Sequence, residues 1–415
     1  ADASGFKTGG GSADVQPFSF VSPLDAITKR AGPGVKVSYD DGSDAQRAAD
    51  LAKSSDVSIL FAGDYQSEGA DKACLTLECP DLHGDQDGLI DTVAGAQPNT
   101  ILVLETGGPV LTPWRDKLKA LLEAWYPGQE GGPAIARVLF GDTDPAGRLP
   151  ATFPRSEDDE PTAGDPEKYP GTEENVSYKE GVLVGYRWWD ANGLAPAFAF
   201  GHGLSYTSFA FRHLRVQPDV GGTLPLTVSV DVQNTGNRTG VTVPQLYLGL
   251  AQPAPGVVQP PKQLRGMAKL RLRPGQRKTV SFAVDRRAVS YWSTNSNGWD
   301  VAAGCYRVMV GRSLRDITNQ AVVSVDGASC TGAVAGVRTV GVCRRSVLIH
   351  LNHVHGHIRK VVAIVLGTRR VLHVRRAAVR VVIGGPQKVT TVRLLVRTSH
   401  GTLRFKRRFH TCARR

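Results

Sequence analysis

The sequence lacks several features that would assign it to a class at once. It has no uninterrupted apolar run of the about 18 or more residues that a membrane-spanning helix needs, so no such helix is predicted. The first residues, Ala1 to Gly5, are not a basic start followed by an apolar run, so they show no secretion signal. No cysteine has the CxxC spacing of zinc ribbons or thioredoxin-like sites.

Acidic residues are absent from the last part of the chain. Residues 327–415 hold 19 Lys and Arg, no Asp or Glu, and seven of the ten histidines. The first 326 residues therefore hold 31 of the 50 Lys and Arg and all 38 Asp and Glu. Their net charge is about −7, although the net charge of the whole chain is +12. The positive charge therefore belongs to the tail, and it does not indicate nucleic-acid binding by the rest of the chain.

The tail also lacks the signatures of nucleic-acid-binding domains. It contains no helix-turn-helix, zinc-finger or RNA-binding motif, and few aromatic residues are interleaved with its basic ones. We therefore expect no nucleic acid as a partner. An anionic cell-wall polymer, held by salt-sensitive contacts, is the partner that this charge favours.

The number of cysteines is even, which suits disulfides in an exported protein better than metal ligation. Buried free cysteines are the alternative. A disulfide between the two cysteines that bracket the tail would suit so small a core. The candidates are Cys74, Cys79, Cys305, Cys330, Cys343 and Cys412, of which the last two bracket the tail.

Helical and strand-like segments alternate in the first half of the chain. Continuous apolar strands with intervening helices predict a mostly parallel α/β sheet covered on both faces. Ser43 is the expected cap of the first helix, and residues 155–175 have the Pro, Gly and acidic content of a surface loop. Helices are expected over 43–53, 85–94 and 131–140, and strands over 57–61, 101–104, 121–125 and 182–189.

The pattern changes at about Leu226. Short alternating strands without helical segments predict a β-sandwich, and the β-branched runs of the tail predict a small basic β-domain. The expected division is thus 1–35 as connection or start of the α/β domain, 36–210 as α/β domain, 211–326 as β-sandwich and 327–415 as basic β-domain. The expected strands include 226–232, 245–248, 279–282, 306–310, 361–366, 371–374, 379–383 and 392–396.

Several short segments follow one another in an order that is more specific than any one of them. They are 9–13 (GGGSA), 21–25 (VSPLD), 66–77 (QSEGADKACLTL), 86–90 (QDGLI), 98–103 (PNTILV), 125–132 (WYPGQEGG), 141–150 (GDTDPAGRLP), 178–187 (YKEGVLVGYR), 200–206 (FGHGLSY), 234–236 (NTG), 261–266 (PKQLRG) and 273–275 (RPG). Together they resemble the second, α/β domain and the fibronectin type III-like domain of glycoside hydrolase family 3. The resemblance covers roughly residues 6–325.

The resemblance implies retaining hydrolysis of a β-linked glucoside or oligosaccharide, which uses two carboxyl groups about 5 to 5.5 Å apart and no cofactor. In the family the nucleophile is an aspartate of an N-terminal barrel domain. The acid/base glutamate of many members lies in a Ser-Glu-Gly segment, which makes Glu68 the candidate here. The family pattern has Asp-Arg where this chain has Asp71 and Lys72, and a lysine does not offer the bidentate fork of an arginine.

Further residues are candidates for contact with substrate. Asp71, Lys72, Tyr186 and Arg187 are the candidates for substrate binding, although at strand spacing packing between domains is favoured for most of residues 186–189. The glycines after Glu130 open a helix that offers backbone amides, but a structural turn is the favoured explanation for them. A histidine cluster at 350, 353, 355 and 357 has no accompanying carboxylate, so an exposed polar face is favoured over a metal site.

The barrel of the family is not represented in the sequence. The first 35 residues are a Gly- and Ser-rich connection and not the eight repeated βα units of a barrel. We therefore expect a truncated, secreted or cell-surface β-glucosidase-like chain with negligible activity of its own. Two alternatives remain: a noncatalytic anchoring module that uses the basic tail, and a partner that supplies Glu68 to a separately encoded barrel.

Overall fold

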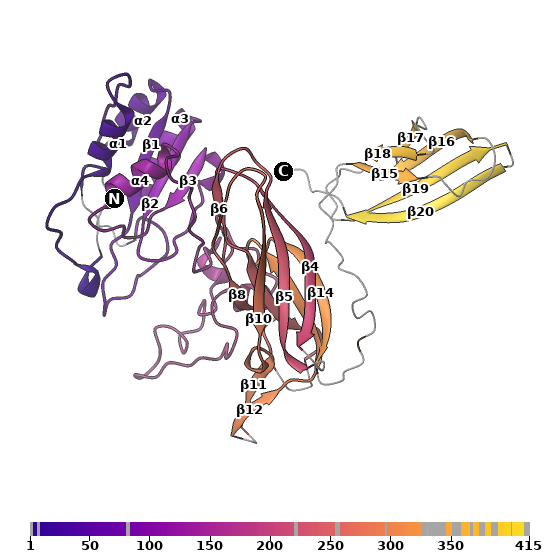
Figure 1. Cartoon of the computed structure of the whole chain (residues 1–415). Helices are drawn as coiled ribbons and strands as arrows, with labels where there is room; N and C mark the ends of the chain where they lie inside the picture. The colour runs from indigo at the N-terminus through magenta and orange to yellow at the C-terminus, as the bar shows by residue number, and fades with distance from the viewer. Residues whose placement is uncertain are drawn as a thin grey trace. The chain divides into compact units, whose positions relative to one another are not determined.

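The structure is a computed structural model (Figure 1). It describes residues 3–5, 9–79, 84–219, 223–253, 258–294, 297–325, 330, 346–350, 358–365, 368–372, 378–382, 389–399 and 401–410. The chain forms two compact units, Ala1–Val337 and Arg338–Arg415. None of the helices in the described ranges is long and apolar enough to cross a membrane.

The first unit begins with a three-stranded parallel sheet in the order β1-β2-β3. Its core has two sides, because successive residues of a strand point to opposite faces. On one face of the sheet Phe61 and Val103 pack with Ile27 of α1 and Ile135 of α4. On the other face Leu102 packs in a cluster with Ile90 of α3. The predicted α/β architecture is confirmed. The elements are α1 (Pro23–Ala31), α2 (Ala45–Lys53), β1 (Ser58–Gly63), α3 (Gln86–Ala96), β2 (Thr100–Glu105), β3 (Ala120–Glu123) and α4 (Gly131–Leu139).

Side-chain caps begin the helices of this domain. Ser22 accepts a hydrogen bond from the backbone N–H of Asp25 at the start of α1, and Asp85 caps α3 in the same way. The expected cap of α2 was wrong by one residue, since Asp44 accepts from the N–H of Arg47 while Ser43 bonds to Asp41. Helix α1 lies within residues 1–35, so this stretch contributes a helix to the α/β core.

The strand expected over 182–189 is wrong. The chain turns at Gly185, whose φ of 58° suits glycine, and then forms the short helix α5 (Tyr186–Ala191). Trp189 is buried, and the Tyr186 ring stacks on Phe200 at a centroid distance of 4.5 Å. Aromatic residues favour strands locally, but here burial of their rings between two layers of structure decides the conformation.

A β-sandwich follows the α/β domain. Val228, Val230 and Val232 alternate with more exposed residues along β5 and are fully buried in the sandwich core. Its sheets have the orders β10-β5-β4, β14-β13-β7-β8, β6-β9 and β11-β12. The strands are β4 (Phe209–Asp219), β5 (Thr223–Asn234), β6 (Gly240–Thr242), β7 (Gln245–Leu250), β8 (Gln263–Met267), β9 (Leu270–Leu272), β10 (Arg277–Val284), β11 (Ser290–Ser293), β12 (Gly298–Val301), β13 (Gly304–Gly311) and β14 (Ile317–Val325).

Buried polar contacts join the sandwich to the α/β domain. Asp144 accepts hydrogen bonds from Ser205 Oγ and from the N–H of Val241, both at 2.7 Å. Asp190 of α5 forms an ion pair with Lys262 at 2.9 Å, and its side chain is only 4% exposed. Asp144 contacts residues on both sides of the junction, and Asp190 reaches from α5 to the sandwich, so these contacts hold the two domains in one orientation.

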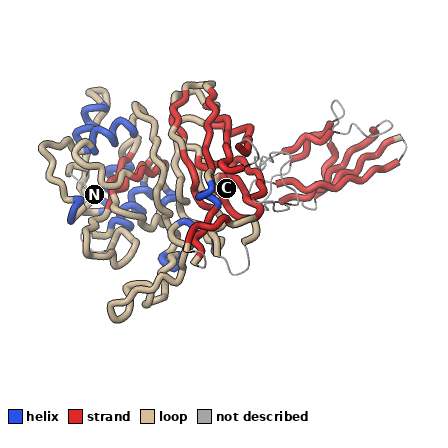
Figure 2. The backbone as a smooth tube through the Cα atoms, turned by 60° about the horizontal axis from the view of Figure 1, so that its bottom comes forward, coloured by secondary structure: helices blue, strands red, loops and turns tan. Residues whose placement is uncertain are grey.

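The second unit consists only of strands in its described residues (Figure 2). They form one sheet with the order β17-β16-β19-β20 and a pair, β15-β18. A small core of Val361, Ala363, Val381, Val392, Leu394 and Val396 lies on one side of the larger sheet. The strands are β15 (Ser346–His350), β16 (Ile358–Val365), β17 (Thr368–Leu372), β18 (Ala378–Val382), β19 (Val389–Thr398) and β20 (Gly401–His410).

Candidate functional site

An acidic residue stands at the carboxyl end of each strand of the parallel sheet. Asp64 directly follows β1, Glu105 ends β2 and Glu123 ends β3. The strands are parallel and in register, so these ends share one edge of the sheet. In open α/β sheets this edge is where ligand-binding groups gather. The loop that carries Glu68 begins at this edge.

Asp64 anchors the Glu68 loop, which we define as residues 65–72. Its carboxylate, 2% exposed, accepts hydrogen bonds from Lys72 Nζ at 2.8 Å and Gln66 Nε2 at 2.7 Å. It also accepts from the N–H of Gly107 at 2.9 Å and the hydroxyl of Tyr126 at 3.1 Å. One carboxylate thus joins the beginning and the end of the loop to the two neighbouring strand ends.

The Lys72 contact explains how Asp64 stays charged in a buried place. Burial acts to raise the pKa of Asp64, but the hydrogen bond and positive charge of Lys72, with the other donors, hold that pKa below its ordinary value. Lys72 is itself only 11% exposed. In this structure Lys72 is therefore a structural partner of Asp64, and its predicted contact with substrate stays a prediction.

Glu68 lies at the exposed tip of the loop, against the N-terminal segment of the chain. Ser12 donates two hydrogen bonds to its Oε2 atom, from Oγ at 2.8 Å and from the backbone N–H at 3.1 Å. These bonds stabilise the ionised form, so they lower the pKa of Glu68. The arrangement suits a carboxylate that accepts a proton. A residue that first donates a proton must be protonated, which requires a change in these surroundings.

Glycines allow the N-terminal segment to approach the Glu68 loop closely. The N–H of Gly10 donates to the carbonyl of Gln66 at 2.7 Å, and a Cβ atom on Gly10 would lie 2.6 Å from Ser67 Oγ. Gly11 has a φ of 60°, and a Cβ atom there would lie 2.8 Å from Oε2 of Glu68. Side chains at these two positions would displace the loop, which gives the GGGSA segment a physical role.

Glu123 is a second carboxyl group with unusual surroundings. Burial raises its pKa to about 8, although it accepts hydrogen bonds from the N–H of Trp125 at 2.8 Å and from Thr106 Oγ1 at 3.3 Å. The nearby charge of Asp64 acts in the same direction as burial. Near neutral pH Glu123 is therefore mostly a neutral acid. Its hydrogen bond from the N–H of Trp125 supports the positive φ of that residue, 55°. The next residue, Tyr126, donates to Asp64.

The other predicted substrate residues lie in different surroundings. Asp71 is exposed in the Glu68 loop. The Tyr186 hydroxyl accepts from the N–H of Leu264 at 2.9 Å, and its ring contacts Tyr247 of the sandwich. Arg187 lies over the Tyr186 ring at 5.8 Å. Tyr186 thus packs at the domain junction, and sugar contacts by it, Asp71 or Arg187 stay predictions.

Four of the six cysteines form disulfides. Cys74 pairs with Cys79 just after the Glu68 loop, and Cys305 of β13 pairs with Cys330. Cys343 and Cys412 lie outside the described residues, so their predicted pairing is untested.

No group of three or more potential metal ligands was found among the described residues. Of the histidine cluster, positions 353, 355 and 357 lie outside those residues, while His350 ends β15. The glycines after Glu130 have a packing role, since a Cβ atom on Gly132 would overlap the main chain at Val21 and Ser22.

Reasoning from the sequence identified Glu68 but missed the residues that position it. Ser12 and Tyr126 lie in the motif segments 9–13 and 125–132, and Asp64 lies in none of them, but their contacts join segments 43 to 62 residues apart, which no segment by itself reveals. One signal was available, because an acid directly after a buried parallel strand points to the ligand-binding edge of the sheet.

Comparison with known proteins identifies the two domains of the first unit. Residues 1–206 match the Glycosyl hydrolase family 3 C-terminal domain, and residues 242–314 match the Fibronectin type III-like domain. Thermostable beta-glucosidase B of Acetivibrio thermocellus is 39% identical over 332 residues, which are 77% of this chain and 43% of that protein. Exo-alpha-(1->6)-L-arabinopyranosidase of Bifidobacterium longum is 35% identical over 347 residues, 80% of this chain and 44% of that protein.

Solved structures give the same result. DesR, a beta-glucosidase from Streptomyces venezuelae in complex with D-glucose, superposes with a TM-score of 0.64 and 41% identity, covering 68% of this chain and 35% of that one. The GH3 beta-glucosidase of Bifidobacterium adolescentis gives 0.69 and 35%, covering 77% and 47%. The chain thus spans less than half the length of these relatives. It belongs to glycoside hydrolase family 3, of which it carries the C-terminal α/β domain and the fibronectin type III-like domain.

Proposed function

We propose that this chain supplies the acid/base half of a retaining glycosidase, with Glu68 as the group that transfers the proton. The supporting observation is the position of Glu68 on an exposed loop that a buried carboxylate, Asp64, fixes at the carboxyl edge of the parallel sheet. Pre-set geometry of this kind is what proton transfer to a glycosidic oxygen needs.

The second carboxyl group comes from a barrel domain of the family in this proposal. The nucleophile attacks the anomeric carbon while Glu68 protonates the leaving oxygen, and the Glu68 carboxylate then takes a proton from the water that releases the sugar. Ser12 stabilises the carboxylate that exists between these two steps. A nucleophile carboxylate about 5 to 5.5 Å away would raise the pKa of Glu68 and favour the protonated form for the first step.

The proposed substrate is a β-linked glucoside, because several relatives are named beta-glucosidases. The similarity to an exo-alpha-(1->6)-L-arabinopyranosidase shows that comparable sequences serve another sugar, so a substrate panel includes both glycosides.

The test measures nitrophenol release from aryl glycosides by this chain, alone and fused to the barrel domain of a relative. We expect negligible release from the chain alone, because a retaining mechanism needs both carboxyl groups. In the active fusion, Glu68→Gln should lower kcat by roughly 10²- to 10⁴-fold, the usual contribution of a general acid or base. Glu130→Gln, which changes another exposed glutamate of the same domain, is the matched control and should keep full activity.

Two results would contradict the proposal. Hydrolysis by the chain alone that disappears in Glu68→Gln would place a nucleophile inside these 415 residues. Full activity of the Glu68→Gln fusion on unactivated glucosides would remove Glu68 from the chemistry.

We also propose that the protein acts outside the cell or at its surface, with the second unit as an anchor to an anionic polymer. The disulfides Cys74–Cys79 and Cys305–Cys330 support an oxidising compartment, and free thiols at these positions in protein from its native source would argue against it.

A further inference from the structure

One face of the sheet in the second unit is covered with basic side chains. The register places Arg393 of β19 opposite Lys406 of β20, and Leu395 opposite Arg404. Because alternate residues share a face, Arg397 lies on the same side, and Lys360 pairs with it from β16. All five basic side chains are exposed. We call this surface the basic sheet face: Lys360, Arg393, Arg397, Arg404 and Lys406.

The opposite face of the same strands forms the core. Val392, Leu394 and Val396 alternate with the basic residues of β19 and are at most 2% exposed. The alternation leaves the cations on the side that no part of the described core covers. Their positions are therefore set by the same strand pairing that forms the core.

The unit contains no acidic side chain that could neutralise this face. From residue 327 to the end of the chain the sequence has 19 Lys and Arg and no Asp or Glu. A surface with one sign of charge and no internal counter-charge attracts anions over about a Debye length, roughly 8 Å at physiological salt. The sign of the charge thus specifies an anionic partner.

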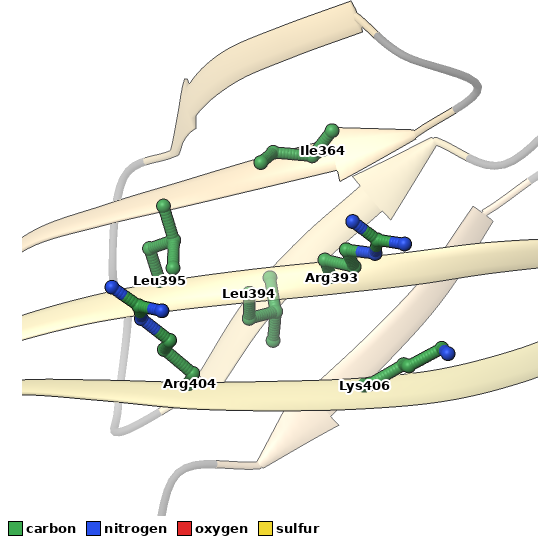
Figure 3. A pocket seen from close by; sticks show the side chains of 6 residues that line it. All are labelled: Ile364, Arg393, Leu394, Leu395, Arg404 and Lys406. Atoms are coloured by element: carbon green, nitrogen blue, oxygen red, sulfur yellow. The ribbon is translucent and has the colours of Figure 1, made fainter.

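Aliphatic side chains lie among the cations. An open hollow of about 310 Å³ is lined by Ile364, Arg393, Leu394, Leu395, Arg404 and Lys406 (Figure 3). Ile364 lies opposite Arg393, and Leu395 lies opposite Arg404, so each apolar side chain has a guanidinium neighbour on the next strand. Both are half-buried, so the charged groups extend beyond them.

We propose that the basic sheet face binds an anionic polysaccharide, a chain of sugar rings that carry carboxylates. Arginine forks bind carboxylates through two parallel hydrogen bonds, and aliphatic side chains suit the apolar faces of sugar rings. Neighbouring strands are about 4.8 Å apart, and residues on one face of a strand about 6.8 Å apart, so the cations of β16, β19 and β20 are spaced for several contacts with an extended polymer.

The same observations favour a polysaccharide over other polyanions. Surfaces that bind single-stranded nucleic acids stack bases on aromatic rings, whereas the lining of the hollow is aliphatic and basic. Binding in a membrane interface requires apolar side chains that extend into the lipid, whereas Ile364 and Leu395 are half-buried among the cations.

The experiment measures binding of the full chain to polygalacturonate by calorimetry, with neutral dextran, single-stranded DNA and anionic phospholipid vesicles as comparisons. We expect binding to polygalacturonate that weakens as salt rises, and none to dextran. The triple variant Arg393→Gln, Arg404→Gln, Lys406→Gln should bind at least tenfold more weakly. The matched control, Arg271→Gln, Arg273→Gln, Lys278→Gln, removes the same charge from exposed positions of the sandwich and should bind as the wild type does.

A second variant keeps the test valid if the triple variant does not fold. Arg393→Lys with Arg404→Lys keeps every charge but removes the forks, and it should lose affinity several-fold. Equal losses in the triple variant and its control, or no binding at all, would overturn the proposal. Tighter binding to DNA or to vesicles would overturn it in favour of that partner. Because the assay needs no hydrolysis, its outcome is independent of the role of Glu68.

Discussion

The two units of this chain treat positive charge in opposite ways. In the first unit Lys72 and Lys262 are 11% and 17% exposed, and each pairs with a carboxylate that is 2% or 4% exposed. In the second unit the side chains of the basic sheet face are exposed, and the sequence of that unit contains no Asp or Glu that could pair with them. Basic residues therefore fix a loop and a domain junction in the first unit, and they create a positive electrostatic potential at the surface of the second unit.

The difference follows from the cost of burying a charge. A buried cation without a partner is strongly destabilising, so the first unit can bury Lys72 at the edge of its parallel sheet only together with Asp64, and Lys262 at the domain junction only together with Asp190. An exposed cation has no such requirement, because water solvates it. The paired lysines of the first unit thus position a loop and a domain junction. The exposed basic side chains of the second unit instead attract anionic partners from solution.

The largest effect on stability is expected from Asp64→Ala, which removes the counter-charge of a buried lysine. This change leaves Lys72 buried without its counter-charge and frees both ends of the Glu68 loop, so we expect a loss of about 3 to 5 kcal/mol in the free energy of unfolding. Urea denaturation measures it. Asp91→Ala removes the partner of Lys117 in an ion pair that is half exposed on both sides, and it should cost only about 0 to 1 kcal/mol. Similar losses in both variants would show that Asp64 does not anchor the loop.

A second change concerns Glu123, a buried carboxyl group that accepts hydrogen bonds from neutral donors, whereas Asp64 accepts one from the charged Lys72. With a pKa of about 8 in the folded state, against an ordinary value of about 4.3, Glu123 binds a proton that the unfolded chain releases between these values. Its contribution to stability is therefore complete below about pH 4.3 and is lost as pH rises through 8. Glu123→Gln keeps the shape and stays neutral, so it should be more stable than the wild type at pH 9, by a few kcal/mol at about 1.4 kcal/mol per pKa unit.

Unfolding of the wild type and Glu123→Gln at pH 5 and pH 9 tests this prediction. The two proteins should differ little at pH 5, and the difference should grow with pH. The exposed Glu130→Gln serves as control and should show no such trend. A pH-independent difference between Glu123→Gln and the wild type would mean that Glu123 is ionised throughout.

The smallest expected effect comes from Ser12→Ala. Two donors hold the Glu68 carboxylate, and the variant keeps only the backbone N–H, so the pKa of Glu68 should rise toward its ordinary value with little change in stability. Titration of carbon-labelled glutamate by NMR measures the pKa directly. Ser54→Ala, whose hydroxyl bonds to the carbonyl of Leu51, is the control. An unchanged pKa in Ser12→Ala would show that the contact is absent in solution.

Much of the architecture was predictable because it follows from local patterns. The apolar runs before Asp64 and in β2 are long enough to identify buried strands, and the alternation along β5 identifies a sandwich strand. Segment 182–189 was not predictable in this way. Its aromatic residues suit a strand, but the turn at Gly185, the burial of Trp189 and the stacking of Tyr186 on Phe200 favour α5.

The sequence by itself determined the family, the candidate Glu68 and the separation of charge between the two units, since motifs, order and composition are properties of the chain alone. Only the tertiary structure decided that Ser12 contacts Glu68, that Lys72 pairs with Asp64, and that the cations of β16, β19 and β20 share one face. These relations depend on which distant segments lie side by side. Strand register and burial set that proximity, and no local pattern of residues encodes it.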